Sequence, residues 1–357
     1  MKVLIIGMGF SGKMFLETFQ NISNMYDEEI KIVYTARNKR DVKIKYYPDV
    51  QQAINEFKPN LVVVAVNDEN HGEILSLLKN YNGFVICEKP LVDPEFDIET
   101  IIKSLSNISG FCLNMVARYS KASLLLKSFV DSHDLKLIRA DFLWEKNRIN
   151  DYRPTTGVMS EIIHPLDLVQ WINFGSALKI TNIQGVKSDF SISGNDIPDS
   201  VSIIGKLNDA VITGYSSFVS LFRRRELDFV FLDKNNELIF AKISFDTPKW
   251  YEDSLMIWKD VKDKSEILLQ YNSLEEEYKG NRKLERLSRV IKNVLDYIIL
   301  KQKPRYDFAT LNEAVYLQKL LNQISSNENE ENYYSVKYNK SSKRILLSEK
   351  NGFDRLG

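Results

Sequence analysis

The sequence contains little cysteine and little histidine. Two cysteines, Cys87 and Cys112, are too few for a disulfide framework, and both lie in apolar runs where a reduced thiol behaves as a small hydrophobe. A reducing, cytoplasmic setting is therefore the default expectation. The three histidines, His71, His133 and His164, are scattered without metal-ligand spacing, so we expect no metal site.

Net charge and long apolar runs are absent as well. The 48 Lys and Arg residues balance the 48 Asp and Glu residues, so the chain lacks the electrostatic footprint of a dedicated nucleic-acid binder. No apolar run has the length of a membrane span, and Gly7 interrupts the short N-terminal run, so neither a signal peptide nor a membrane partner is expected. With 357 residues, of which 44% are hydrophobic, the chain is long enough for two globular domains.

The first third of the chain alternates two hydrophobic periods. Strand-like runs at residues 3–6, 31–36, 61–66, 84–87 and 111–116 are separated by segments with helical spacing. The run at 61–66 is almost purely β-branched, as expected of a strand buried on both faces of a parallel sheet. Residues 1–117 are therefore predicted to form an α/β domain with a doubly wound, Rossmann-type parallel sheet.

The pattern changes after about residue 118. A helix is predicted over 121–130, a strand over 137–144, a polar loop over 145–156 and a helix over 158–172. Strand-like runs then recur near residues 180, 201, 211, 227 and 238 without intervening helices. Consecutive strands predict an α+β domain over 118–330 with a large, mostly antiparallel open sheet, closed by helices near 282–300 and 311–324. Residues 331–357 are a C-terminal extension without an assigned role.

A glycine-rich segment, residues 7–12, follows the first predicted strand and begins a helix. In this context Gly7 permits a tight turn, Gly9 lets the backbone approach a pyrophosphate, and Gly12 allows close packing of helix and strand. The phosphates would lie at the helix N-terminus, where free amides and the helix dipole favour negative charge. We predict a dinucleotide site that includes Phe10 and Ser11. A tight turn without a ligand is the alternative interpretation.

The second predicted strand ends without the acidic residue that binds the ribose hydroxyls of NAD. Ala36 stands at that place, and Arg37, Lys39 and Arg40 follow it. Cations at this point favour a 2′-phosphate, so NADP is the predicted cofactor, with Ala36 and Arg37 among its contacts and NAD as the alternative. Ordinary solvated loop cations explain the same residues equally simply.

Four further segments, taken with the glycine turn, resemble the Gfo/Idh/MocA oxidoreductases. Residues 88–90 read Glu-Lys-Pro at the end of the fourth predicted strand. Residues 65–71, Ala-Val-Asn-Asp-Glu-Asn-His, are similar to the family's Ala-Thr-Pro-Asn-x-x-His, and residues 118–120, Arg-Tyr-Ser, to its Arg-Phe-Ser. Residues 157–167 resemble its glycine-led helix start with His-x-x-Asp. The order and spacing match over about 330 residues.

The resemblance implies that Lys89 and His164 are the catalytic pair at the nicotinamide. The chemistry is compatible, because oxidation of a secondary alcohol needs a group that takes the hydroxyl proton, and an ammonium group stabilises the developing alkoxide. Each residue alone also fits a structural role, as a surface cation or a buried helix residue. The resemblance further implies cofactor contacts from Ala65, Asn67, His71, Glu88 and Lys89, and substrate contacts from Lys89, Arg118, Glu161, His164 and Asp167.

One position departs from the family pattern. Many members carry Asp four residues before the histidine, where it can orient the imidazole, and here that residue is Ser160. Glu161 is predicted as a catalytic residue that contacts the substrate or the imidazole, and Asp167 can reach the same helix face. A favourable carboxylate at the helix start is the alternative for Glu161.

Arginines in two further segments each have two interpretations. Residues 151–154 resemble a Tyr-Arg segment of members from surface-polysaccharide and acidic-sugar pathways, and Arg153 would suit a carboxylate or phosphate of the substrate. A solvated loop arginine is the alternative. The run Arg223 to Arg225 could bind a diphosphate, but it also matches a charge run at a strand start and is interpreted as solvated. His133 fits a helix C-terminus and has no predicted catalytic role.

The leading hypothesis is an NAD(P)-dependent oxidoreductase that transfers hydride to or from a hydroxyl or keto carbon of a sugar derivative. A second is an NAD-dependent glycosidase that oxidises its substrate transiently. A third, suggested by the departures at Val66, Asn67 and Ser160, is a non-catalytic NADP-binding sensor, and an imine or linear-tetrapyrrole reductase is a lesser alternative. By resemblance, a homodimer or homotetramer would form through the C-terminal sheet.

Overall fold

The computed structural model describes residues 1–150, 156–191, 197–262, 264–275, 281–326 and 331–338. Contacts divide the chain into two compact units. The first unit comprises Met1–Tyr119 and Gly280–Lys319, and the second comprises Ser120–Lys279 and Leu320–Gly357, so that the division falls inside the last helix. Each unit has its own sheet.

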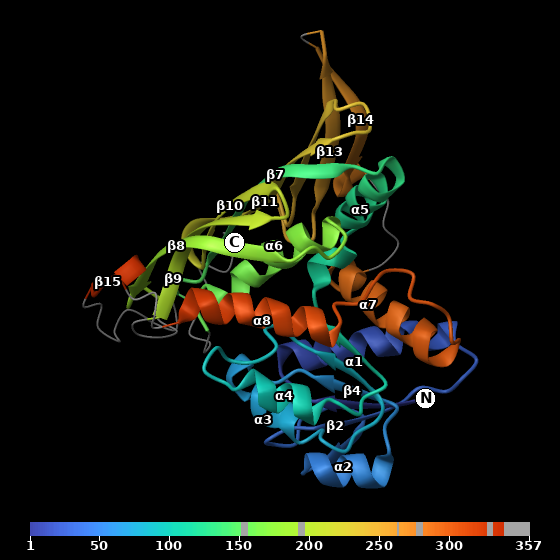
Figure 1. The fold of residues 1–357 in the computed structure, drawn as a ribbon. Helices are drawn as coiled ribbons and strands as arrows, with labels where there is room; N and C mark the ends of the chain where they lie inside the picture. The colour runs from blue at the N-terminus through green and yellow to red at the C-terminus, as the bar shows by residue number, and fades with distance from the viewer. Residues whose placement is uncertain (151–155, 192–196, 263, 276–280, 327–330, 339–357) are drawn as a thin grey trace. The chain divides into compact units, whose positions relative to one another are not determined.

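The first unit contains a six-stranded parallel sheet in the order β3-β2-β1-β4-β5-β6 (Figure 1). The chain changes its winding direction between β1 and β4, and dinucleotides bind at such switch points in doubly wound sheets. The predicted Rossmann sheet is therefore confirmed. Its strands are β1 (Lys2–Ile6), β2 (Lys31–Thr35), β3 (Lys45–Tyr47), β4 (Leu61–Val64), β5 (Phe84–Cys87) and β6 (Gly110–Leu113). Its helices are α1 (Phe10–Ile22), α2 (Val50–Phe57), α3 (His71–Ser76), α4 (Ile98–Ser104), α7 (Arg282–Ile299) and the first part of α8 (Leu311–Ser325).

Helix α7 packs on the first unit although it lies late in the chain. Its apolar stripe, which includes Leu287, Val290, Ile291 and Val294, joins the core formed around α1, β1 and β4. Burial of each such side chain stabilises the folded state by about 1.5–3 kcal/mol. The boundaries predicted from sequence, which assign residues 118–330 to a second domain, therefore differ from the observed division. Sequence order places α7 after the second domain's strands, whereas its apolar stripe is buried in the first unit's core.

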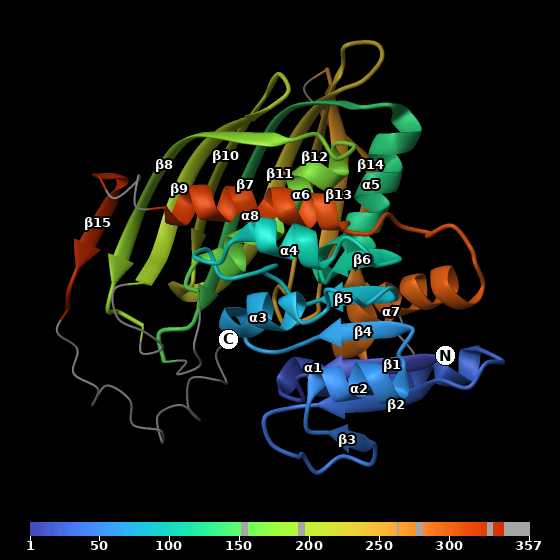
Figure 2. The same ribbon diagram turned by 60° about the horizontal axis from the view of Figure 1, so that its bottom comes forward.

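The second unit contains a nine-stranded sheet in the order β14-β13-β12-β11-β7-β10-β9-β8-β15 (Figure 2). Neighbouring strands are antiparallel except for the parallel pairs β7 with β10 and β8 with β15, which confirms the predicted mostly antiparallel sheet. The strands are β7 (Lys136–Asn147), β8 (Leu178–Ser188), β9 (Ile197–Leu207), β10 (Ala210–Ser217), β11 (Val219–Leu232), β12 (Leu238–Ser244), β13 (Ser254–Val261), β14 (Lys264–Asn272) and β15 (Tyr333–Val336). Its helices are α5 (Lys121–His133) and α6 (Met159–Ile172).

Several elements differ from the sequence predictions. Strand β3 has three residues, too few to show a two-residue period, and β14 is an edge strand whose side chains are exposed or half-buried, so it lacks the usual alternation. Helix α3 ends at Ser76, whereas the hydrophobic spacing predicts a helix over residues 71–81. Strand β15 lies in the C-terminal extension and adds a parallel strand beside β8.

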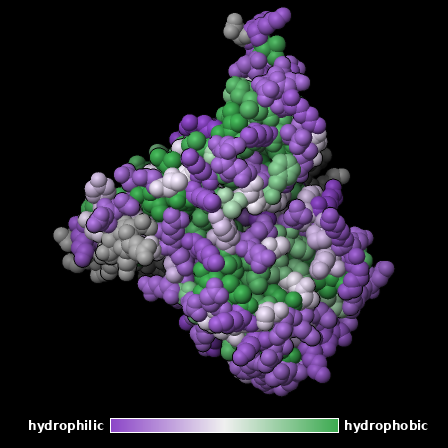
Figure 3. All heavy atoms as spheres, in the orientation of Figure 1, coloured by the Kyte–Doolittle hydropathy of each residue, from purple (hydrophilic) through white to green (hydrophobic). Residues whose placement is uncertain are grey.

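Apolar side chains reach the surface of the second sheet. Figure 3 shows hydrophobic side chains among hydrophilic ones over β13 and β14, where Met256 and Ile267 are exposed. On β9, Ile203 is buried and its neighbour Ile204 is exposed, so successive residues face opposite sides of the sheet. Such a surface is compatible with the predicted homo-oligomer, which remains a prediction.

Candidate functional site

The glycine turn after β1 has the geometry of a phosphate-binding turn. Gly7 has a φ of 96°, and a Cβ there would lie 2.5 Å from the Ala65 carbonyl oxygen. A Cβ at Gly12 would lie 2.0 Å from the Gly7 oxygen, so only glycine fits either position. A Cβ at Gly9, the N-cap of α1, would meet no described atom within 4 Å, and no side chain of the described residues caps this helix. The space and the first amides of α1 therefore fit the pyrophosphate of a dinucleotide.

Two side chains hold Glu88, which directly follows β5. Ser11 Oγ, in the first turn of α1, donates a hydrogen bond of 2.6 Å to Glu88 Oε1, and Asn114 Nδ2 donates one of 2.8 Å to the same oxygen. The buried Oδ1 of Asn114 has no hydrogen-bond partner among the described residues. These contacts tie Lys89, the next residue, to the glycine turn. Sequence reasoning missed Asn114, although its position directly after β6 places it at the carboxyl edge of the sheet.

His71 connects two loops at the same edge of the first sheet. Its ring is fully buried, with Nδ1 2.7 Å from the Pro90 carbonyl oxygen and Nε2 3.2 Å from that of Val66. The imidazole therefore fixes the backbone beside Lys89, and its contacts with carbonyl oxygens argue against the predicted direct contact with the cofactor. On the segment between β4 and α3, Ala65 is buried and Asn67 is exposed, and their cofactor contacts remain predictions.

The cations after β2 lie at the surface. Arg37, Lys39 and Arg40 are exposed, and Ala36 is half-buried. The Arg40 backbone amide donates a hydrogen bond of 2.7 Å to Tyr34 Oη, which fixes the path of the loop. Exposed cations at this edge fit the predicted 2′-phosphate contact and also the solvated-loop alternative.

Arg118 has a structural partner within the first unit. Its side chain is 2% exposed, and Nη2 donates a hydrogen bond of 3.0 Å to Oε1 of Glu313, in the first turn of α8. Burial and this ion pair argue against the predicted contact with substrate. The sequence does not reveal the pairing, because the two residues are 195 positions apart.

The two cysteines lack the properties of nucleophiles. Burial, reinforced by the negative charges of Glu88 and Asp68, raises the pKa of Cys87 well above its ordinary value. Burial raises the pKa of Cys112 to about 12. Both thiols are therefore neutral at physiological pH, which supports their interpretation as small hydrophobic residues.

In the second unit, helix α6 starts from a glycine turn braced against β9. Gly157 has a φ of 70°, and a Cβ there would lie 2.2 Å from the Pro198 carbonyl oxygen. The Val158 amide donates a hydrogen bond of 2.7 Å to that same oxygen. Ser160, at the place of the family's Asp, donates from Oγ to the Gly157 carbonyl oxygen at 3.1 Å. This start sets the helix face that carries the predicted catalytic residues.

His164 lies on α6 against the aromatic face of Trp144 on β7. The ring centroids are 5.4 Å apart with an interplanar angle of 28°. Both side chains are buried, as is Asp167 one turn further along the helix. The packing holds the imidazole plane within 28° of the indole plane of Trp144. Sequence reasoning did not link Trp144 to His164.

Glu161 belongs to an ion-pair network. Its Oε2 accepts a hydrogen bond of 3.0 Å from Arg225 Nη2, and its Oε1 accepts one of 3.3 Å from Lys146 Nζ. Arg225 Nη1 also donates to Asp246 Oδ2 at 2.5 Å. Arg225 is only 8% exposed, so its interpretation as a solvated residue is wrong. The strand register pairs Arg225 with Trp144, which is buried. A run of three arginines in the sequence does not show which of them is buried.

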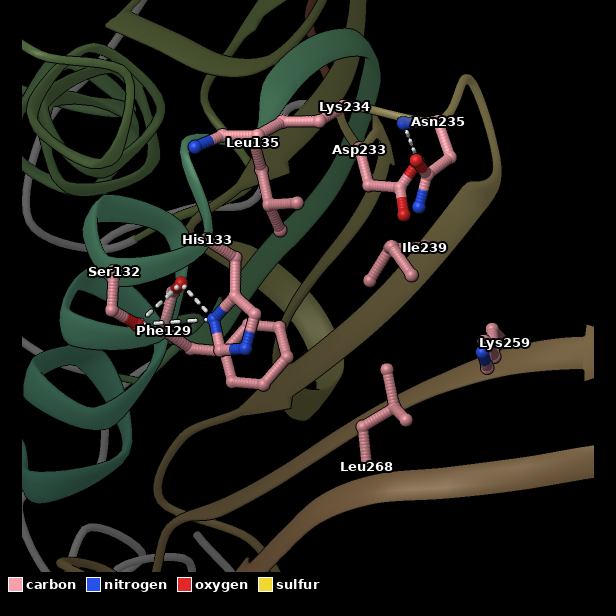
Figure 4. Close-up of a pocket in the computed structure, with 10 residues that line it drawn as sticks. All are labelled: Phe129, Ser132, His133, Leu135, Asp233, Lys234, Asn235, Ile239, Lys259 and Leu268. Carbon is pink, nitrogen blue, oxygen red and sulfur yellow. Dashed lines mark hydrogen bonds between the residues drawn. The ribbon is translucent and has the colours of Figure 1, made fainter.

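Arg153 lies outside the described residues. His133 ends α5 and borders a hollow of about 500 Å³ (Figure 4), where its Nδ1 lies 2.9 Å from the Phe129 carbonyl oxygen and its ring stacks on the Phe129 ring. This geometry matches the predicted helix-end role.

Within the described ranges, no helix is long and apolar enough to cross a membrane, and no group of three or more His, Cys, Asp or Glu side chains is placed to hold a metal ion.

Comparison with known proteins gives relatives at low identity. Inositol 2-dehydrogenase of Salmonella typhimurium (strain LT2) is 22% identical over 182 residues, which are 48% of this chain and 54% of the relative. The chain thus spans about half the length of the curated relatives it matches.

Solved structures resemble the whole fold. UDP-N-acetylglucosamine 3-dehydrogenase from Acidithiobacillus ferrooxidans aligns with a TM-score of 0.66 at 15% identity, covering 91% of this chain and 96% of that one. Levoglucosan dehydrogenase, solved in complex with NADH and L-sorbose, aligns with a TM-score of 0.70 at 14% identity, covering 93% and 97%. At these identities the likeness shows the fold alone.

The family model described as the oxidoreductase family with an NAD-binding Rossmann fold matches residues 1–107. These residues contain the glycine turn and the Glu88-Lys89-Pro90 segment described above. This part of the chain, residues 1–107, is therefore similar to the Gfo/Idh/MocA oxidoreductases.

Proposed function

We propose that this protein is a dehydrogenase that uses NADP(H), with NAD(H) as the alternative, and acts on a hydroxyl or keto carbon of a sugar derivative. The observation that carries the proposal is the 2.6 Å hydrogen bond from Ser11 to Glu88. It ties the glycine turn that fits a pyrophosphate to the segment that carries Lys89. A phosphate-binding turn joined in this way to a proton-active side chain favours hydride transfer over simple nucleotide binding.

Lys89 and His164 are the proposed catalytic pair. When bound, the nicotinamide cofactor supplies the hydride acceptor or donor. In the oxidising direction, His164 takes the proton of the substrate hydroxyl, while the Lys89 ammonium donates a hydrogen bond to the same oxygen and stabilises its developing negative charge. In the reducing direction the proton returns to that oxygen. Both electrons travel with the hydride, so no further reductant is needed.

The other predicted site residues have different proposed roles. Glu161, which is buried between Arg225 and Lys146, is a positioning residue in this proposal, because both of its carboxylate oxygens bind cations. Asp167, buried one turn after His164, supports the same helix face. Arg37 is proposed to bind the 2′-phosphate of NADP(H), because it is exposed at the end of β2 where no carboxylate would bind a ribose hydroxyl.

A cofactor-coupled screen tests the proposal. Purified protein is mixed with each oxidised cofactor and a panel of sugars, nucleotide sugars and sugar acids, and the near-ultraviolet absorbance of reduced nicotinamide is followed. We expect reduction with at least one panel member. Absence of binding by both NADP(H) and NAD(H), measured by calorimetry, would contradict the proposal.

The same screen separates the two competing functions. A glycosidase with transient oxidation would convert its substrate without net change in the cofactor, so product analysis by chromatography is run in parallel. A non-catalytic sensor would bind the cofactor without turnover, and replacing His164 would change nothing measurable. Either pattern would replace the dehydrogenase proposal.

A further inference from the structure

A group of three cations lies beside α6 in the second unit. Lys146 is on β7, and Arg223 and Arg225 are on β11. The register pairs Arg225 with Trp144, and the Arg225 guanidinium lies 5.1 Å from the Trp144 ring centroid. Because the same indole also stacks on the His164 ring, Arg225 of this cation cluster lies one side chain away from His164.

All three cations converge on a second indole. Trp250, in the loop between β12 and β13, is 37% exposed. The Arg223 guanidinium lies 4.0 Å from the Trp250 ring centroid, the Arg225 guanidinium 5.1 Å and Lys146 Nζ 5.7 Å. Cation–π contact with one ring keeps three like charges close together and at the edge of solvent. Three like charges at this separation repel one another and raise the electrostatic free energy of the fold unless negative charge lies nearby.

Carboxylates balance only part of this cluster. Glu161 pairs with Arg225 and Lys146, and Asp246 pairs with Arg225. Arg223 makes no ion pair with any carboxylate in the described part of the chain, and its Nε donates only to the Asp246 carbonyl oxygen, at 2.9 Å. Arg223 therefore has capacity for another acceptor.

Buried guanidinium donors support the same conclusion. Arg223 Nη1 and Arg225 Nε are buried and have no hydrogen-bond partner among the described residues. Burial lowers the pKa of the Arg223 guanidinium, an effect that Asp246 opposes and Arg225 reinforces. Buried donors without acceptors are uncommon in folded proteins and are often explained by a ligand that completes them. The planar fork of arginine matches the oxygens of a carboxylate or phosphate.

We propose that Arg223, with Lys146 and Arg225 beside it, binds an oxyanion on the sugar substrate, either a carboxylate or a phosphate group. The inference rests on the proposed function and adds a substrate class to it. Glu161 holds Arg225 and Lys146 in place, while Arg223 makes the principal contact. The half-exposed Trp250 forms one wall of this subsite and reports on its occupancy.

The experiment compares binding of matched sugars to the full-length chain. Glucuronate, glucose 6-phosphate and glucose are titrated, with calorimetry and tryptophan fluorescence as readouts that need no turnover. We expect at least one anionic sugar to bind about ten- to a hundredfold more tightly than glucose. The tighter of the two identifies the oxyanion as carboxylate or phosphate.

Variants assign this preference to Arg223. Arg223→Gln should remove the preference, and Arg223→Lys should restore part of it. Arg224→Gln is the matched control, because Arg224 is exposed on the neighbouring position of the same strand and pairs with Glu226, so the preference should persist. Circular dichroism confirms that each variant is folded.

The inference is overturned if wild-type protein binds no sugar of the three, if it binds glucose as tightly as both anions, or if the preference survives in Arg223→Gln. Its failure is distinguishable from failure of the proposed function. An oxyanion preference that depends on Arg223, found without any cofactor-linked turnover, would support this subsite and contradict the dehydrogenase. Cofactor-linked turnover of neutral sugars alone would support the dehydrogenase and contradict this subsite.

Discussion

The indole of Trp144 lies against the imidazole of His164, with ring centroids 5.4 Å apart and planes 28° from parallel. Trp144 comes from a strand of the second sheet and His164 from the helix that covers it. A rigid aromatic surface under a proposed proton acceptor limits the orientations of its ring, which is how precise geometry is maintained at catalytic sites. The stacking therefore links the packing of α6 on β7 to the orientation of the proposed proton acceptor.

Removing this aromatic surface should slow turnover. Trp144→Leu should lower kcat about tenfold with little change in KM, because the imidazole loses its support while substrate contacts remain. It should also lower the free energy of unfolding by about 2–4 kcal/mol. Trp144→Phe, which keeps a flat ring, should recover most of the kcat. Steady-state kinetics on folded samples checks this, and wild-type kcat in Trp144→Leu would show that the stacking has no catalytic role.

Cofactor choice should depend on Arg37. Replacing it with Ala should raise the Kd of NADPH about tenfold and leave the Kd of NADH unchanged, because only NADPH carries a 2′-phosphate. Quenching of protein fluorescence gives both constants. Lys43→Ala, which removes another exposed cation from the same loop, is the control. Equal weakening of both cofactors in the Arg37 variant would assign Arg37 to a different contact.

The hydrogen bond between Ser11 and Glu88 should appear as an energetic coupling. In a double-mutant cycle of Ser11→Ala and Glu88→Gln, the free energies of unfolding should deviate from additivity by about 1 kcal/mol. Urea titration supplies the four values. A second cycle with Ser106→Ala, whose hydroxyl bonds to the Lys103 carbonyl oxygen, should be additive. Additivity in the first cycle would mean that this bond does not join the two segments.

Asp199 gives a pH-dependent prediction. Burial raises the pKa of its carboxyl group above the ordinary value of 3.8, although hydrogen bonds from Ser188 and Ser200 oppose the shift. As pH rises, the unfolded chain therefore loses this proton before the folded chain does. The carboxyl group's contribution to the free energy of unfolding is fully present below the unfolded-state pKa and is lost as the pH rises through the folded-state pKa.

The comparison variant is Asp199→Asn, which cannot ionise. The free energy of unfolding of the wild type, relative to this variant, should decrease as pH is raised from below 3.8 towards neutrality. Chemical unfolding at several pH values measures the difference. A difference that stays constant, or that increases with pH, would rule out a raised pKa at Asp199.

Local patterns predicted much of the fold. The apolar run in β4 and the glycine turn after β1 indicate a parallel sheet and its dinucleotide edge directly, because the relevant contacts lie close in sequence. The position of α7 could not be predicted in this way, because an amphipathic stripe does not specify which core buries it. Strands β3 and β14 also escaped prediction, since neither has a buried face long enough to show the two-residue period.

The candidate site likewise has a part that local sequence predicts and a part that depends on contacts between distant residues. Short motifs predicted Lys89 and His164 as site residues. The contact between Glu161 and Arg225 was not predicted, because the two residues are 64 positions apart. Their contact depends on the register of β11 against β7 and on the rotation of α6, which residue types alone do not specify. For the same reason, an arginine run that looks solvated in the sequence contains one buried and one half-buried member.

The most direct test of the account is isotope transfer between cofactor and sugar. The substrate found in the screen is oxidised by the wild-type protein after deuterium has been placed at its reacting carbon, and the reduced cofactor is examined by mass spectrometry. We expect one deuterium in the reduced nicotinamide, and rates lowered about a hundredfold or more in Lys89→Met and in His164→Gln. Reduced cofactor without deuterium, or transfer at the wild-type rate by both variants, would rule out hydride transfer assisted by Lys89 and His164.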